Sequence, residues 1–305
     1  MQLNEETIDT PPKPAASVIL LRDAQAPQGL ERVEVFLVKR HGNSKVLGGA
    51  YVFPGGKLDA DDVQVVLAEQ LAQSSEQLFL QLQEPEQSPQ GAAALYVAAL
   101  REAFEECGVL FAKHLQASKP LDVLQAAKNL NALIQEGRPF SKALGQLGFL
   151  LDTAALVPWA RWITPKTPTV SNQRFDARFF LGVMPKNQTA LHDNVETTHS
   201  TWITPKDALK AYCAKEIELA APQIMTLIDL ARFKSTACAV AHARAQSTPK
   251  IEPHSTSIDG VRVVCFPGDV LHPLKDKILH GPSRLWFKEG LFQPSEGLGS
   301  LLMDD

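Results

Sequence analysis

Three glutamates within one predicted helix form the first cluster of residues that could carry chemistry. Glu102, Glu105 and Glu106 lie in the segment REAFEECGV (101–109), and at 100° per residue their side chains fall within an arc of about 100°. Like charges at i,i+4 destabilise a helix by about 0.2–0.5 kcal/mol. Arg101 can offset only part of this repulsion by pairing with Glu105. A bound cation would offset the rest.

A pair of glycines upstream of this helix could complete a metal site. Gly55 and Gly56 follow the short apolar segment AYVFP (50–54), and glycine allows the backbone to approach an ion closely. Mg²⁺ prefers oxygen ligands in near-octahedral geometry, which carboxylates and a backbone carbonyl can provide. Such a site polarises a phosphoryl group and lowers the pKa of a bound water. The spacing alone leaves two interpretations open: a hydrolytic metal centre or a solvated acidic face.

The elements that must position these residues are strands and helices in irregular order. Strands are expected at 17–21, 33–40, 50–54, 159–164, 174–184 and 196–205, with short strands at 261–266 and 283–292. Helices are expected at 60–83, between an N-cap at Ser88 and a C-cap at Gly108, within 120–151, and at 205–233. Regular βαβ alternation is absent, so we expect an α+β fold with a mixed sheet covered by helices rather than a doubly wound fold.

Composition excludes several classes of protein. The chain has 305 residues, is 45% hydrophobic and carries a formal net charge of −4 without a basic run, so a general nucleic-acid binder is excluded. No stretch approaches about 18 consecutive apolar residues, and the N-terminus lacks an apolar h-region, so neither a membrane span nor a signal peptide is expected. The cysteines are far apart and form no CxxC pair, which indicates reduced thiols and a cytoplasmic protein: Cys107, Cys213, Cys238 and Cys265.

The glutamate segment resembles the second half of the Nudix box, GX5EX7REUXEEXGU, in which U is a bulky apolar residue. The matching residues are Arg101, Glu102, Glu105, Glu106, Gly108 and Val109. The segment FPGGKLDADD (53–62) resembles the first half, with Gly56 as the box glycine and Asp62 where the family has glutamate. The 38 residues 63–100 separate Asp62 from Arg101 where the box has seven, so about 31 residues interrupt it. Asp59 or Asp61 could take the place of Asp62.

An interrupted box resembles the branch of the Nudix superfamily that contains coenzyme A diphosphatases. The coenzyme A-associated signature has a glycine, three residues, FPGG and a later aspartate, and it fits Gly49, Phe53, Pro54, Gly55, Gly56 and Asp59. Its arginine, four residues before that first glycine, is replaced by Lys45. The resemblance spans roughly residues 15–235. It implies a Nudix-type mixed sheet sandwiched by helices (α/β/α), with helical insertions and a short β-containing C-terminal tail.

The resemblance also implies how the chain is divided. The expected parts are a flexible arm (1–14), a Nudix hydrolase domain (15–245) with helical insertions at about 60–90 and about 115–157, and a C-terminal extension (246–305). The second insertion either lines the substrate pocket or forms a homodimer contact. The extension either packs on the main domain, which we expect, or forms a small β unit of its own.

The resemblance assigns roles to the clustered residues. Glu105 and Glu106 are metal ligands, the Gly56 carbonyl completes the shell of Mg²⁺ or Mn²⁺, and Arg101 orients a glutamate. Glu102 is either a ligand or the base that orients the attacking water. Because Nudix proteins place the base variably, Glu196 is its rival.

The implied substrate is a small molecule with a diphosphate bridge, with no nucleic acid and no membrane as partner. Coenzyme A or acyl-coenzyme A would be hydrolysed to 3′,5′-ADP and (acyl-)4′-phosphopantetheine. Candidate cations for its phosphates are Arg40 and Lys45, and also Arg174 and Arg178, which share one face of a strand. Two alternatives remain: a pyrophosphatase acting on ADP-ribose or dinucleotides, and a non-catalytic Nudix module that senses a ligand.

Overall fold

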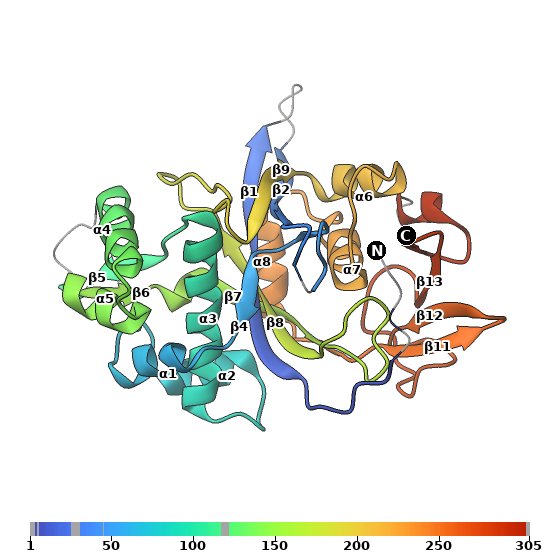
Figure 1. The fold of residues 1–305 in the computed structure, drawn as a ribbon, viewed down its shortest axis with the longest axis horizontal. Coiled ribbons are helices and arrows are strands. Elements are labelled where there is room, and N and C mark those ends of the chain that lie inside the picture. The colour runs from blue at the N-terminus through green and yellow to red at the C-terminus, as the bar shows by residue number, and fades with distance from the viewer. Residues whose placement is uncertain (1–3, 5, 26–30, 45, 117–121, 303–305) are drawn as a thin grey trace.

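A mixed β-sheet with helices on both faces forms the body of the computed structural model, which describes residues 4, 6–25, 31–44, 46–116 and 122–302 (Figure 1). Its strands lie in the order β10-β7-β8-β1-β2-β3, while β4 pairs with β1 and β9 pairs with β2. β1 is parallel to β8 and antiparallel to β2 and β4. The bounds are β1 Lys13–Gln25, β2 Glu31–Arg40, β3 Tyr51–Val52, β4 Gly55–Lys57, β7 Leu156–Ile163, β8 Phe175–Val183, β9 Thr197–Ile203 and β10 Lys250–Ile251.

The side chains of β1 alternate between two hydrophobic cores, one on each face of the sheet. Val18 and Leu20 pack with the helices α1 (Ala60–Leu67), α2 (Ser75–Leu82) and α3 (Pro89–Cys107). Ile19 and Leu21 pack with α6 (Pro205–Cys213), α7 (Ala221–Leu230) and α8 (Thr236–Ala245). The expected α+β fold with an α/β/α arrangement is therefore confirmed. None of the described helices combines the length and apolarity needed to cross a bilayer.

The helix that carries the glutamates, α3, is capped at both ends as expected. The Ser88 hydroxyl accepts a hydrogen bond from the Gly91 N–H at 3.0 Å, and Pro89 occupies the first turn. Gly108 closes the helix with φ 69°, a left-handed conformation that glycine adopts without strain. The stretch 92–100 is buried on every side, because α3 lies between the sheet and the helices α1 and α2.

The single helix expected at 60–83 is wrong, because the chain forms two short helices there. Between α1 and α2 the backbone pairs with Leu151. The Ala72 N–H donates to the Leu151 carbonyl at 2.9 Å, and the Leu151 N–H donates to the Gln70 carbonyl at 2.8 Å. Ser74 and Gln77 then form a capping box that starts α2. Ser-x-x-Gln is a helix-start signal that could have been read from the sequence.

The N-terminal segment expected to be a flexible arm is held against the loop that precedes β8. The Asn4 N–H donates to the Thr169 carbonyl at 2.6 Å, and the Ile8 N–H donates to the Lys166 carbonyl at 2.7 Å. β1 begins at Lys13, earlier than the expected residue 17. Residues 1–3 and 5 lie outside the described part of the chain.

The second insertion covers α1 rather than extending the sheet. It contains α4 (Val123–Gln135) and α5 (Phe140–Leu147), and a separate strand pair, β5 (Ala112–His114) with β6 (Phe149–Leu151), flanks these helices. The Ser141 N–H and hydroxyl both donate to the Asp61 carboxylate, at 2.8 and 2.5 Å. The insertion is thereby fixed to the first turn of α1.

The C-terminal extension packs on the main domain as an antiparallel sheet. Its strands, in order, are β11 His254–Ile258, β12 Val261–Cys265, β13 Arg284–Lys288 and β14 Leu291–Gln293. The Tyr212 hydroxyl of α6 donates to the Phe292 carbonyl at 2.9 Å and accepts from the Phe292 N–H at 2.7 Å. The rings of Trp162 in β7 and Phe266 meet edge to face with centroids 6.1 Å apart.

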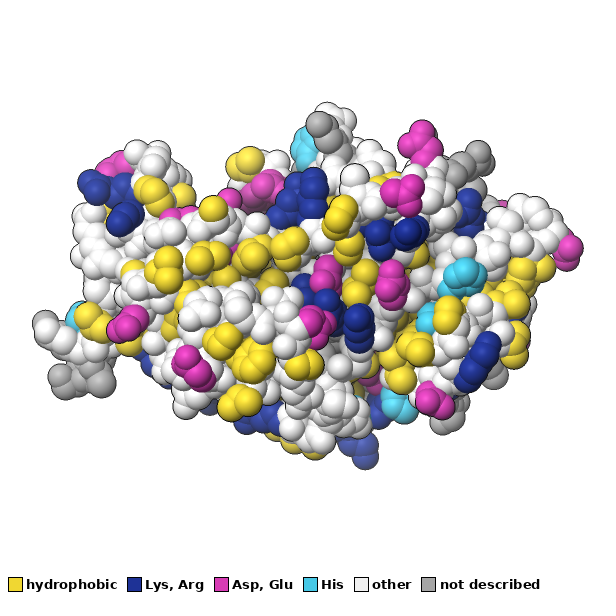
Figure 2. All heavy atoms as spheres, turned by 90° about the horizontal axis from the view of Figure 1, so that it is seen from below, with side chains coloured by type: hydrophobic (Ala, Val, Ile, Leu, Met, Phe, Trp, Pro, Cys, Tyr) yellow, Lys and Arg dark blue, Asp and Glu magenta, His cyan; other side chains and the backbone are white. Residues whose placement is uncertain are grey.

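Charged side chains of both signs are mixed on one face of the molecule. On the face shown in Figure 2, the described Lys and Arg side chains are interspersed with Asp and Glu, without a continuous basic patch.

Replacing Tyr212 with phenylalanine should lower the free energy of unfolding by about 1–3 kcal/mol, because two buried backbone groups of Phe292 lose their partner. Urea unfolding measures the change. The matched control is Tyr96→Phe, since the buried Tyr96 hydroxyl has no hydrogen-bond partner among the described residues. Equal losses in both variants would contradict the docking role of Tyr212.

Candidate active site

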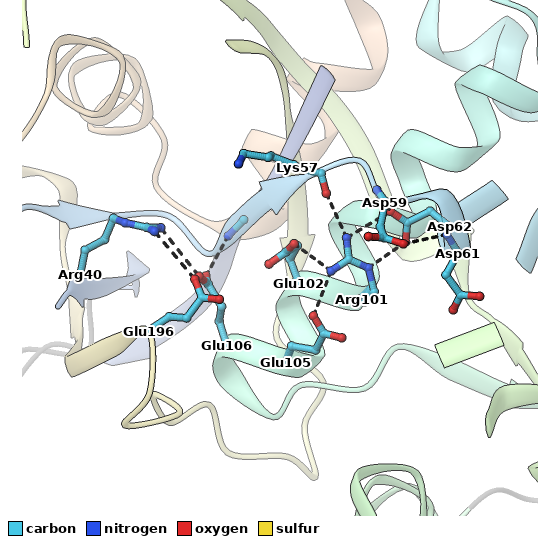
Figure 3. A network of polar contacts seen from close by, with 11 residues as sticks. Arg40, Lys57, Asp59, Asp61, Asp62, Arg101, Glu102, Glu105, Glu106 and Glu196 are labelled. Carbon is cyan, nitrogen blue, oxygen red and sulfur yellow. Dashed lines mark hydrogen bonds and ion pairs between the residues drawn. The ribbon is translucent and has the colours of Figure 1, made fainter. Parts of the chain in front are cut away.

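The glycine turn and two of the glutamates, distant in sequence, meet at the edge of the sheet (Figure 3). The Gly55 N–H donates to Glu106 Oε2 at 2.9 Å. A Cβ atom at Gly56 would lie only 2.2 Å from Glu102 Oε1, and one at Gly55 only 2.3 Å from the Ser17 hydroxyl oxygen. Both positions therefore require glycine for a close approach of β4 to α3 and β1.

Arg101 lies at the centre of the polar network in Figure 3 and joins three elements. Its Nε and Nη2 atoms donate to Asp62 at 2.8 and 3.1 Å, and Nη2 also donates to the Lys57 carbonyl at 3.0 Å. Its Nη1 atom donates to Glu102 Oε1 at 2.8 Å and to Glu105 Oε2 at 2.9 Å. One guanidinium thus orients two glutamates of α3 relative to β4 and α1.

The three aspartates that could have completed the box have separate roles. Asp62, fully buried, takes the Arg101 guanidinium in a bidentate pair and also accepts from the Asp59 N–H at 2.7 Å. The Asp59 carboxylate caps α1 by accepting from the Asp61 N–H at 2.8 Å. Asp61 is bound to Ser141. Of the three, Asp62 is the one that pairs with Arg101.

Glu106 is a buried carboxylate whose lost contacts with water are only partly replaced by hydrogen bonds and ion pairs. It is 3% exposed, and its Oε1 atom has no hydrogen-bond partner among the described residues. Arg40 is the nearest cation, with Nη1 3.9 Å from Glu106 Oε1 and Nη2 3.8 Å from Glu196 Oε2. Burial raises the pKa of Glu106 to about 8 despite the bond from Gly55.

The neighbouring glutamates are perturbed in the same direction. Burial raises the pKa of Glu102 to about 7, although the adjacent Arg101 acts against this change. Burial also raises the pKa of Glu105, which is more exposed. On one helix, burial raises the pKa values of three carboxylates, and the nearby Arg101 and Arg40 only partly compensate their loss of water.

These features fit a hard divalent cation. The unpartnered Glu106 oxygen, the glycine cradle against Glu102 and the all-oxygen donor set match the preference of Mg²⁺ or Mn²⁺ for carboxylate and carbonyl ligands. Arg101 holds Glu102 and Glu105, and among the described residues no three acidic, histidine or cysteine side chains stand closely enough together to form a finished ligand cluster.

A cavity of about 690 Å³ opens beside the network. This volume lies within the range of about 300–1,000 Å³ typical of small-molecule sites. Gly55, Gly56 and Glu102 line one end of it, and apolar side chains of β7 and β8 line the other. Of the described residues in the insertion 115–157, none lines the cavity.

The candidate phosphate-binding residues fall into three groups. Arg40 lines the cavity. Lys45 lies outside the described residues. Arg174 and Arg178 do not line the cavity, which corrects the expectation that they bind substrate.

Arg174 and Arg178 are buried on the opposite face of the strand. Arg178, 1% exposed, donates to Glu84 Oε1 at 3.0 Å, and Arg174 donates to the Thr164 carbonyl at 2.9 Å. The alternate residues Phe175, Ala177 and Phe179 face the cavity instead. The alternation of arginines and apolar residues along the strand was predicted correctly, but the face that meets the cavity was not. The glutamates that pair with the two arginines, Glu84 with Arg178 and Glu252 with Arg174, are distant in sequence.

Lys57 is a candidate functional residue that the sequence analysis missed. Its carbonyl accepts from Arg101, and the residue lines the cavity directly after Gly56. The sequence signal that could have identified Lys57 is its position directly after the box glycine, Gly56. Ala177 and Phe179 of β8, which line the cavity, were not predicted as site residues either, although their alternation with polar residues can be read from the sequence.

Comparisons with known proteins show which proteins this chain resembles. The family model of the NUDT19 Nudix domain matches residues 13–232. The acyl-coenzyme A diphosphatase NUDT19 of Gallus gallus is 29% identical over 258 residues, covering 72% of this chain and 68% of that protein. The protein of the same name from Xenopus laevis is 27% identical over 228 residues, covering 66% of this chain and 60% of that protein. The chain thus spans less than two thirds of the Xenopus relative.

A solved structure shares the arrangement. The crystal structure of a NUDIX hydrolase from Alicyclobacillus acidocaldarius superposes with a TM-score of 0.59 at 26% sequence identity. The match covers 76% of this chain and 97% of that one. Most of this chain therefore has a counterpart in a solved fold.

Replacing Gly56 with alanine should lower any metal-dependent activity of this site by about 100-fold, because the added methyl group displaces the Glu102 carboxylate. Steady-state kinetics measure the loss, and the melting temperature shows whether the fold survives. Gly299→Ala is the matched control, since a Cβ there meets no atom within 4 Å. Full activity in Gly56→Ala would remove Glu102 from the site.

The raised carboxyl pKa values predict a pH-dependent stability of the metal-free protein. A carboxyl whose pKa is higher in the folded state favours unfolding once the pH rises above its ordinary value of 4.5, and for Glu106 this penalty is complete above about 8. The chelated protein should therefore lose stability between these values. In Glu106→Gln this loss should be smaller by about 1 kcal/mol or more.

Urea unfolding near pH 5.5 and pH 8.5, in the presence of a chelator, measures this difference. Saturating Mg²⁺ near pH 8.5 should raise the melting temperature of the parent protein and have less effect on Glu106→Gln. Identical pH profiles, or a parent melting temperature that Mg²⁺ does not change, would contradict the assignment.

Proposed function

The chain belongs to the NUDT19 Nudix domain family, and from this premise we propose that it hydrolyses the diphosphate linkage of coenzyme A or acyl-coenzyme A. The products would be 3′,5′-ADP and 4′-phosphopantetheine or its acyl derivative. The observation that carries the proposal is the convergence of Gly55, Gly56 and the Arg101-oriented glutamates beside a cavity of about 690 Å³. The names of the relatives support the substrate class.

The proposed cofactor is Mg²⁺ or Mn²⁺. Glu102, Glu105, Glu106 and the Gly56 carbonyl would hold it: Glu102 lies against Gly56, Glu106 accepts a hydrogen bond from the Gly55 N–H, and Glu105 shares the Arg101 guanidinium with Glu102. When bound, the cation would supply charge neutralisation at the diphosphate and activation of water. Retention of all three glutamates after Arg101 also argues against a module that only senses a ligand.

The protein's own residues contribute position and charge. Arg101 fixes Glu102 and Glu105, so the carboxylates do not need to reorganise when substrate binds. Arg40 and Lys57 line the cavity and are the cations placed to contact the phosphate oxygens. The attacking water adds to one phosphorus while the bond from that phosphorus to the bridging oxygen breaks, leaving two monophosphates.

Glu196 is the proposed acceptor of the proton from the attacking water. Its side chain is 63% exposed, lines the cavity, and among the described residues forms a long ion pair of 3.8 Å with Arg40. Glu102, its rival, is 13% exposed and already accepts a hydrogen bond from Arg101 at 2.8 Å. Glu196 is therefore the carboxylate that is freer to take up a proton.

With Mg²⁺, the purified protein should convert coenzyme A into 3′,5′-ADP and 4′-phosphopantetheine, and mass spectrometry identifies both products. Glu106→Gln should lower the rate by at least about 100-fold and weaken stabilisation by Mg²⁺. Glu196→Gln should lower kcat by about 100-fold while stabilisation by Mg²⁺ remains, as expected for a base that is not a ligand.

Glu136→Gln is the matched control, because Glu136 is exposed and its contact at 3.9 Å is with Arg138, away from the cavity. ADP-ribose and a dinucleotide serve as competing substrates. Faster turnover of either than of coenzyme A would contradict the proposed substrate. A fully active Glu196→Gln would return the role of base to Glu102.

A further inference from the structure

The floor of the cavity crosses four paired strands from the glutamate site to the C-terminal extension. Lys57 of β4 pairs with Ala15 of β1, Ala15 pairs with Ala177 of β8, and Ala177 pairs with Trp162 of β7. All four residues line the cavity. Neighbouring strands lie about 4.8 Å apart, so this row extends about 14 Å from β4 to β7.

Charge is confined to one end of this floor. Among the described residues that line the cavity, the charged ones all belong to the network around the glutamates or adjoin it: Arg40, Lys57, Asp59, Arg101, Glu102 and Glu196. Beyond Ala15 the lining consists of apolar, hydroxyl and amide side chains, among them Phe175, Phe179 and Gln223. A phosphate would find no cation in that part, whereas a neutral chain would bury apolar surface there.

The C-terminal extension closes the neutral end. Ser255 of β11 and Val264 of β12 are directly paired, so they share one face of the extension sheet, and both line the cavity. The hydroxyl groups of Ser255 and Thr169 lie 3.2 Å apart, which joins the extension to the loop before β8. Ser255 and Val264 lie beyond residue 232, where the match to the family model ends.

We propose that the pantetheine arm of the substrate lies along this row and that an acyl group on its sulfur meets the extension, where Ser255 and Val264 set the accepted chain length. The inference rests on the proposed function. About twelve bonds separate the phosphate oxygen from the sulfur, and an extended chain advances about 1.1–1.2 Å per bond, which gives about 14 Å. The sulfur would therefore reach β7, where the extension begins.

If the pantetheine arm lies along this row, the nucleotide of the substrate lies on the opposite side of the glutamates. On the other side of the glutamates, Arg40 lines the cavity together with Ser44 and Leu47 and provides a cation there. The 3′-phosphate therefore lies at the charged end and the acyl group at the neutral end.

The test compares kcat/KM for coenzyme A with that for a series of acyl-coenzyme A substrates from acetyl to decanoyl. Each methylene buried in the cavity should lower KM by about fourfold until the chain meets the extension. Ser255→Phe should lower the decanoyl-to-coenzyme A ratio of kcat/KM by about tenfold or more, mainly through KM. Val264→Ala, which widens the same wall, should shift the preferred chain length upward.

Ser257→Phe is the matched control, because Ser257 lies two residues further along the same strand, is exposed, and does not line the cavity. Its ratio should equal that of the parent. Equal ratios in parent, Ser255→Phe and Val264→Ala, all folded by melting temperature, would overturn the inference. A parent protein that releases no 3′,5′-ADP from coenzyme A would instead overturn the proposed function.

Discussion

The buried pair between Arg101 and Asp62 is the interaction on which the arrangement of the site depends. Removing one partner of a buried charge pair is costly, because the other charge remains unpaired. Here the pair also fixes direction: the remaining donors of the guanidinium reach the Lys57 carbonyl, Glu102 and Glu105. Because guanidinium is planar and carries five donors, a single side chain can hold α1, β4 and α3 in one geometry. The elevated pKa values of the glutamates follow from crowding them into this buried edge.

The interruption of the box by residues 63–100 leaves this geometry intact because the inserted chain packs as part of the domain. The helices α1 and α2 lie against α3 and bury Val65, Leu78 and Leu82 in the same core. The entropy cost of a longer connection rises slowly with length, so packed apolar surface can offset it. A second buried cluster in this region, Arg178 with Glu84, ties the end of the inserted segment to β8. The arginines on the face of β8 that points away from the cavity therefore stabilise the fold around the site and do not line the cavity.

Much of the framework could be predicted from the sequence, since it depends on local signals. The caps of α3, the alternation of β8 and the glutamate spacing are all local, and the Nudix resemblance supplied the pairing of Gly56 with the glutamates. Contacts between distant segments could not be read in the same way. The box spacing pointed to Asp62 and left Asp59 and Asp61 as alternatives, and the fold directs Asp62 to Arg101 and Asp61 to Ser141. Likewise, which face of β8 meets the cavity depends on Glu84, 94 residues away from Arg178.

The most direct test of the central claim is a double-mutant cycle of Asp62→Asn and Arg101→Lys, read out as the affinity for Mn²⁺ by titration calorimetry. If Asp62 acts on the metal site through Arg101, each substitution should weaken Mn²⁺ binding by about 10–100-fold, and the double variant should be no weaker than the worse single variant. If the two losses multiply, or if Asp62→Asn binds Mn²⁺ as the parent does, the pair does not organise the glutamates and the account is wrong.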